Sequence, residues 1–169
     1  YIGIHFITPI DIETASLNAV IPFILKRGTK KHPDISDINA YLDSLYGANL
    51  SIGVRKLGDN QVISMGLEFL SDKFCIQSGV KNECIEFLKE LIFDPYTEGN
   101  AFSKDYTENE KKNLIDKIEG RINDKRTYSL TRLIEIMCEN EPYGTDELGS
   151  IEKTKEIDNK AAYEQYKKI

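Results

Sequence analysis

The sequence contains few of the side chains that bind metal ions or act as nucleophiles. Its 169 residues include two histidines, His5 and His32, and three cysteines, Cys75, Cys84 and Cys138. Neither histidine has a histidine or cysteine neighbour at helical spacing, so the two do not predict a zinc site. An odd number of cysteines without a Cys-x-x-Cys pair is typical of reduced core residues, which favours a cytoplasmic location.

Sequence patterns for membrane insertion, secretion, serine nucleophiles and phosphate binding are also missing. No stretch reaches the roughly 18 apolar residues of a transmembrane helix, and no signal peptide is visible. The serines lack a Gly-x-Ser-x-Gly setting, and there is no glycine-rich phosphate loop. The formal net charge of −6 argues against binding to nucleic acid or to an anionic membrane. This acidity indicates a solvated surface or, alternatively, an acidic chamber that favours basic peptides.

What the sequence does contain is a regular series of apolar patterns. Residues 1–7 alternate as a strand, and residues 50–69 predict a β-hairpin around Gly58-Asp59-Asn60. Apolar residues at three- and four-residue spacing predict further helices. These helices fall at about residues 34–47, 80–93, 105–125, 130–137 and 159–169.

The first helix is predicted to begin at Thr8-Pro9, with Thr8 as its cap, and to end at Gly28. Its apolar residues lie all round the helix, which indicates burial. Pro22 falls inside it and costs roughly 3 kcal/mol in a helix interior. A kinked continuous helix is favoured over the alternative, in which Pro22 begins a new helix.

The order of strand, two helices, hairpin and further helices predicts an α+β fold. In such a fold an antiparallel sheet is covered by helices on one face. We expect residues 1–169 to form a single domain. Because the chain begins at Tyr1 within an apparent strand, we also expect it to be a fragment of a longer protein.

Three segments resemble a known family in their order and spacing. They are Lys26-Arg27-Gly28-Thr29-Lys30-Lys31, Leu45-Tyr46-Gly47-Ala48 and the Gly58-Asp59 hairpin. The chain resembles the N-terminal half-domain of the pitrilysin/insulinase metallopeptidases, which include insulin-degrading enzyme and the mitochondrial processing peptidase. The resemblance continues through Pro142-Tyr143-Gly144 to the last helix, and implies a LuxS/MPP-like metallohydrolase half-domain.

The resemblance also implies that the catalytic site of that family is degenerate in this chain. Active members carry His-x-x-Glu-His on the first long helix, just before a Gly-Thr pair, and these positions fall on Ala19, Pro22 and Phe23. Two histidines four residues apart bind zinc from one helix face, and the glutamate is the general base. The third ligand position falls on Lys117, and Glu110 matches a supporting glutamate. The carboxylate of Asp116 alone does not hold zinc.

This pattern predicts an inactive peptidase homologue without metal or cofactor. By resemblance, we expect it to pair with an active homologous zinc peptidase, or with itself, and to form part of a peptide-binding chamber in a bacterial cytoplasm. The second half-domain is absent from this sequence. The alternatives are a non-enzymatic structural or assembly protein and an active zinc peptidase that uses other ligands.

Overall fold

The computed structural model describes residues 1–76 and 78–169. Its strands are β1 (Ile2–Pro9), β2 (Asn49–Leu57) and β3 (Asn60–Glu68). Its helices are α1 (Ala15–Leu25), α2 (Ile35–Ser44), α3 (Val80–Phe93), α4 (Lys104–Gly120), α5 (Lys125–Met137), α6 (Ile151–Glu156) and α7 (Asn159–Tyr166). Short 3-10 turns occupy Asp72–Phe74, Arg121–Asn123 and Pro142–Gly144.

The three strands form an antiparallel sheet in the order β1-β3-β2. β2 and β3 are the predicted hairpin, and Gly58 at the turn has a φ of 57°, a conformation that favours glycine. Ile4 of β1 and Ile52 of β2 both lie opposite Met65 of β3, so alternate residues of all three strands share one face. This face is apolar and lies under the helices.

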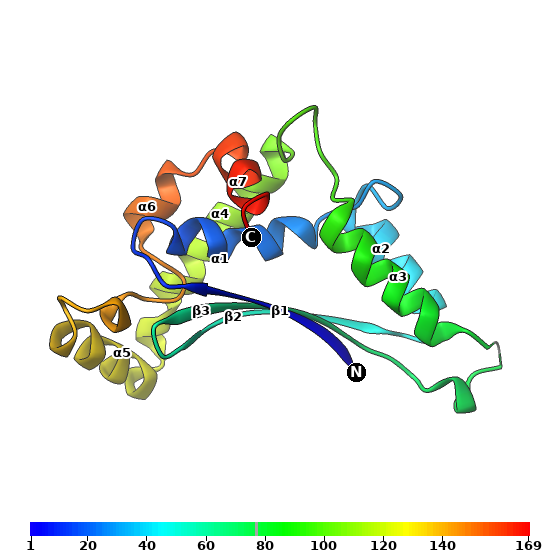
Figure 1. Ribbon diagram of the computed structural model, residues 1–169, viewed down its shortest axis with the longest axis horizontal. Coiled ribbons are helices and arrows are strands. Elements are labelled where there is room, and N and C mark those ends of the chain that lie inside the picture. Colours follow the sequence, from blue (N-terminus) through cyan, green and yellow to red (C-terminus); the bar gives the residue numbers. More distant parts are fainter. Residues whose placement is uncertain (77) are drawn as a thin grey trace.

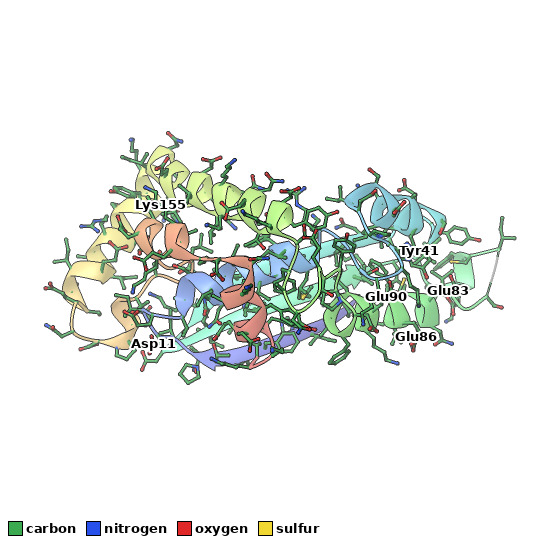
Figure 2. The ribbon with its side chains drawn as sticks, turned by 90° about the horizontal axis from the view of Figure 1, so that it is seen from above. Asp11, Tyr41, Glu83, Glu86, Glu90 and Lys155 are labelled. Carbon is green, nitrogen blue, oxygen red and sulfur yellow. The ribbon has the colours of Figure 1, made fainter. Side chains whose placement is uncertain are left out.

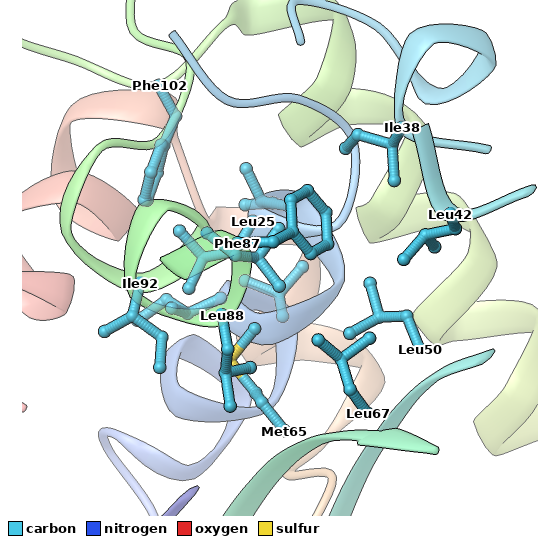
Figure 3. Packing of buried hydrophobic residues seen from close by; sticks show 14 of the residues in the cluster. Leu25, Ile38, Leu42, Leu50, Met65, Leu67, Phe87, Leu88, Ile92 and Phe102 are labelled. Carbon is cyan, nitrogen blue, oxygen red and sulfur yellow. The ribbon is translucent and has the colours of Figure 1, made fainter. Parts of the chain in front are cut away.

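Most of the helices lie on that one face of the sheet, while α5 lies beyond one of its ends (Figure 1). In the core, Phe87 and Leu88 of α3 lie with Leu25 of α1 over Met65 and Leu67 of the sheet (Figure 3). All of these side chains are at least 96% buried. The predicted α+β fold with helices on one sheet face is therefore confirmed.

The predicted start of the first helix is wrong. β1 continues through Pro9, which lies opposite Asn60, and the Ile10 N–H donates to the Asp59 carbonyl at 2.8 Å. A proline is tolerated there because β1 is an edge strand and its missing N–H can face away from the ladder. The carboxylate of Asp11 instead accepts the Glu13 N–H at 2.7 Å, and α1 begins only at Ala15.

Two further boundaries differ from the sequence prediction. α4 ends at Gly120, and Ile122, expected on its apolar stripe, lies in a 3-10 turn and is 49% exposed. α6 was not predicted, because its six residues include a single buried one, Thr154, and therefore show no apolar period. Its start is capped by Ser150, whose hydroxyl accepts the Lys153 N–H.

Candidate functional site between α1 and α4

α1 carries three of the positions that the resemblance assigned to a zinc site. Ala19 is fully buried, Pro22 is buried and Phe23 is half-buried. The helix runs through Pro22 without a break, and the Lys26 N–H donates to the Pro22 carbonyl at 3.2 Å. The predicted continuity of the helix through Pro22 is confirmed, and the alternative of a new helix at Pro22 is wrong; the kink stays a prediction.

The fourth position, Lys117, lies on α4, which runs beside α1 (Figure 2). Its ammonium nitrogen is 5.2 Å from the centroid of the Phe23 ring. A cation over an aromatic face is attracted by the negative charge of the ring face, by about 0.5–1 kcal/mol at an exposed site. Two of the four positions therefore touch each other, although they are distant in the sequence.

Glu110 lies almost two turns before Lys117 on α4, and its carboxylate is engaged on both oxygens. Arg27, two residues after the end of α1, donates to one oxygen, and Asn113 donates to the other at 3.2 Å. The Glu110 side chain is 9% exposed and that of Arg27 is 27% exposed. The carboxylate is thus held by a cation just after α1 and links α4 to the end of that helix.

These side chains offer little to a metal ion. Ala19, Pro22 and Phe23 present a methyl group, a pyrrolidine ring and a phenyl ring, and Lys117 presents a cation. No group of three or more histidine, cysteine or acidic side chains that could hold a metal ion occurs in residues 1–76 and 78–169. The arrangement therefore supports packing and electrostatic contact rather than hydrolysis.

The two histidines lie elsewhere. His5 is on β1 and its Nδ1 is 2.8 Å from the Ser64 hydroxyl, whereas His32 lies in the loop after α1 and stacks on Tyr41 with ring centroids 4.7 Å apart. The predicted separation of the two histidines on a strand and a loop is confirmed. Asp116 is exposed on α4.

A polar cluster at the end of α1 was missed by the sequence reasoning. The Thr29 hydroxyl donates to the buried Glu90 carboxylate of α3, and the Lys31 ammonium lies 3.1 Å from its other oxygen. The His32 N–H donates to the Thr29 hydroxyl at 2.9 Å. Glu90 is labelled in Figure 2. Glu90 follows the buried Phe87 by three residues on α3 and so shares its helix face. This spacing could have predicted that Glu90 is buried.

This cluster also affects Tyr41 of α2. Burial raises the pKa of the Tyr41 phenol, and the nearby Glu83 carboxylate raises it further. A tyrosine phenol is neutral at neutral pH even with its ordinary pKa, so this shift widens the pH range over which Tyr41 packs as a neutral aromatic ring. The cluster fixes the loop after α1 to α3 through the Glu90 carboxylate.

A second buried network surrounds the middle of α1. The Asn18 amide donates to the Gln61 carbonyl oxygen at 2.9 Å, and the Gln61 amide donates to the Ala15 and Glu147 carbonyls at 2.9 and 2.6 Å. Gln165 of α7 donates to Asn18 at 2.8 Å. These bonds set the position of α1 between the sheet and α7.

The chain is similar over nearly its whole length to a curated protein, the probable inactive metalloprotease YmfF of Bacillus subtilis (strain 168). The two are 35% identical over 161 residues, which make up 95% of this chain and 38% of YmfF. The chain thus spans well under half the length of this relative. No model of a protein family matches it.

Solved structures show the same fold. A conserved protein from Enterococcus faecalis V583 matches 98% of this chain and 39% of its own, with a TM-score of 0.91 and 25% identity. A peptidase M16 inactive domain from Pseudomonas fluorescens matches 97% of this chain and 37% of its own, with a TM-score of 0.67 and 14% identity. The periplasmic protease PqqL from Escherichia coli matches 98% of this chain and 18% of its own, with a TM-score of 0.66 and 11% identity.

Within the described residues, no helix is both long and apolar enough to cross a membrane.

Proposed function

Because the chain is a homologue of the pitrilysin-type metallopeptidases, we propose that residues 1–169 form one inactive half-domain of such a protein. Its role is to bind peptides as part of a chamber wall rather than to cleave them. The single observation that carries this proposal is the contact between Phe23 and Lys117. In this contact the Phe23 ring and the Lys117 ammonium occupy two of the positions where the family binds zinc.

The loss of activity rests on four positions rather than one. Ala19 and Phe23 keep the four-residue spacing of a ligand pair on one helix, but neither has a lone pair to offer a metal ion. Pro22 replaces the general base, and Lys117 replaces the acidic third ligand by a cation. Glu110, which matches the supporting glutamate, is held by Arg27. No single reversion would restore the site.

Pairing with an active homologous subunit is supported by the surface of α5. This helix has no buried residue in its thirteen, and each of its large apolar side chains on the outward face is more than half exposed: Leu130, Leu133, Ile136 and Met137. An apolar stripe of this kind is typical of an interaction surface. The same stripe suits the alternative function, a non-enzymatic assembly subunit, and a cytoplasmic location remains a prediction.

The experiment uses the full-length protein and measures bound zinc by elemental analysis and cleavage of unstructured peptides. We expect neither stoichiometric zinc nor cleavage. A variant that carries Ala19→His, Pro22→Glu, Phe23→His and Lys117→Glu together is expected to bind about one equivalent of zinc, because it restores three ligands in one place. A matched control variant carries the same changes on α1 and Lys112→Glu in place of Lys117→Glu, and is expected to bind zinc weakly.

One equivalent of tightly bound zinc in the unchanged protein would refute the proposal. Equal zinc binding by the two rebuilt variants would show that Lys117 is not at the third ligand position. For the pairing, we expect the full-length protein to co-purify with a homologue that carries His-x-x-Glu-His. Co-purification with an unrelated assembly instead would support the alternative function.

A further inference from the structure

The charges at the two ends of α5 oppose the dipole of the helix. Cations occupy its first two positions and anions follow its last turn, and we call these four residues the terminal charges of α5: Lys125, Arg126, Glu139 and Glu141. Acidic residues stabilise the amino end of a helix and basic residues its carboxyl end. The first turn of α5 nevertheless contains no acidic residue and its last turn no basic one. Apart from the cap residue Asp124, the charges at the ends therefore do not stabilise α5.

The terminal charges of α5 also have no partner of opposite charge. Among residues 1–76 and 78–169, none of the four makes an ion pair. All four are exposed. Arg132, in the middle of the helix, is by contrast paired with Glu135 of the next turn. One end of α5 thus presents positive charge to solvent and the other end presents negative charge.

Between these ends, the exposed apolar side chains of α5 form a narrow stripe. Leu130, Leu133 and Met137 are three and four residues apart, so they lie along one face of the helix. Arg126 precedes Leu130 by four residues and extends the same face. α5 lies beyond one end of the sheet (Figure 1) and packs chiefly on the 3-10 turns that flank it in the chain. The described residues therefore leave this face uncovered.

Such a helix is complementary to a second copy of itself that runs in the opposite direction. Arg126 lies seven residues before Leu133, and Glu139 and Glu141 lie six and eight residues after it. If two antiparallel helices cross at Leu133, the basic end of each lies beside the acidic end of the other, and the two apolar stripes face each other. The dipoles of the two helices also attract in this arrangement. A parallel pair would instead place like charges together.

We infer that two copies of this protein associate through α5, with the two helices antiparallel about a two-fold axis near Leu133. This inference rests on the proposed use of α5 as an interaction surface and names a second copy of the chain as the partner. A contact between identical surfaces closes on itself, so it forms a dimer rather than a filament. A homologue that carries His-x-x-Glu-His would then compete with the second copy for α5.

Pairing would also stabilise α5 itself. A helix of thirteen residues without a buried side chain is marginal in water, so a partner that covers its stripe favours the helical state. Two helices of this length bury less than the roughly 1,200 Å² of a stable interface. We therefore expect a reversible dimer with a Kd of about 10 µM rather than an obligate one.

The first test is sedimentation velocity of the full-length protein under reducing conditions, at concentrations about tenfold below and above the expected Kd. We expect monomer at the lowest concentration and dimer at the highest. Leu133→Glu should weaken the dimer at least about tenfold, because it places a charge at the centre of the apolar contact. The control, Leu57→Glu, changes a similarly exposed leucine at the end of β2 and should leave the dimer unchanged.

Charge reversal tests the antiparallel direction. Lys125→Glu combined with Arg126→Glu should weaken the dimer about tenfold at low salt, and so should Glu139→Lys combined with Glu141→Lys. A mixture of these two double variants should associate as well as the unchanged protein. A single chain that carries all four changes should also associate, because opposite charges again meet at both ends of the pair.

The matched control carries Lys104→Glu and Lys112→Glu on α4, which change the net charge equally and should leave the dimer intact. Circular dichroism establishes that each variant is folded. A monomer at every concentration would overturn the inference, as would a dimer that Leu133→Glu leaves unchanged or a four-change chain that does not associate. In each case the proposed function would stand if the protein binds peptides without zinc.

The homologue provides the last distinction. If the protein alone is a monomer and Leu133→Glu abolishes its co-purification with the homologue that carries His-x-x-Glu-His, the homologue is the partner of α5. That result would overturn the inference and support the pairing proposed above.

Discussion

The contact between the Lys117 ammonium and the Phe23 ring joins α4 to α1 without a bound metal ion. The neighbouring ion pair of Arg27 with Glu110 joins α4 to the turn that follows α1. The two contacts differ in exposure, because the Glu110 side chain is 9% exposed whereas Lys117 is open to solvent. The buried pair should therefore contribute to stability, and the exposed one mainly to recognition.

Replacing Glu110 by alanine tests this difference. Because Glu110→Ala leaves Arg27 half-buried and unpaired, and leaves Asn113 without its acceptor, we expect a loss of about 2 kcal/mol in the free energy of unfolding. The measurement is urea denaturation followed by circular dichroism. Glu119→Ala, which removes an exposed carboxylate of the same helix, should change the stability by less than about 0.5 kcal/mol. Equal losses in both variants would contradict the role given to Glu110.

Among helices and strands, α1 depends on the loop that follows it. Gly28 was predicted as the glycine that ends the helix, but α1 ends three residues earlier and Gly28 has no positive φ. A Cβ atom at Gly28 would lie 2.2 Å from the Pro33 carbonyl oxygen. The Gly28 carbonyl also accepts the Tyr96 N–H at 2.9 Å. Glycine is therefore required here by the close approach of the Pro33 backbone, and the bond to Tyr96 joins this loop to the segment after α3.

Gly28→Ala should consequently lower the free energy of unfolding by about 3 kcal/mol, because the contact is with backbone that cannot move freely. Thermal denaturation measures the loss. The control, Gly120→Ala, adds a methyl group into open space at the end of α4 and should stabilise the protein by about 0.5 kcal/mol. A Gly28→Ala protein as stable as the unchanged one would disprove the close approach.

The sequence predicted those elements whose residues repeat with a clear period. The hairpin of β2 and β3 and the core helix α3 were predicted because their apolar residues alternate or recur every three to four positions. The start of α1 was mispredicted because Thr8-Pro9 has the residues of a helix cap, whereas pairing with Gln61 and Asn60 keeps both in a strand. Local propensity was overridden there by a partner more than fifty residues away.

For the candidate site, the sequence predicted four residue positions but not the contacts between them. That α1 continues through Pro22 followed from its apolar residues. The approach of Lys117 to Phe23 and the pairing of Arg27 with Glu110 depend on how α4 lies against α1, which no local pattern contains. The zinc positions themselves came from the resemblance.

At the scale of the whole molecule, the core lies between α1, α3 and one face of the sheet, while α5 contributes no buried residue. α1 is thus buried along most of its length, whereas the large apolar side chains of α5 are exposed. This contrast supports the proposal that α5, rather than α1, contacts another protein.

From the strand order β1-β3-β2 we predict the order in which the strands pair during folding. β2 and β3 are joined by a short turn, whereas β1 pairs with β3 through partners as far apart as Ile2 and Leu67. Closing the short loop costs less chain entropy, so the hairpin should form first and then offer its free edge to β1. Pulse-labelled hydrogen exchange during refolding should find the amides of β2 and β3 protected before those of β1, and the opposite order would refute this.

α1 directly follows β1 in the chain and lies across the sheet that β1 completes. The helix that carries Phe23 can therefore dock only late, after the hairpin exists. During synthesis the chain must extend well past residue 68 before that docking can occur. The face of α1 that packs on the sheet is therefore buried only after all three strands have been made.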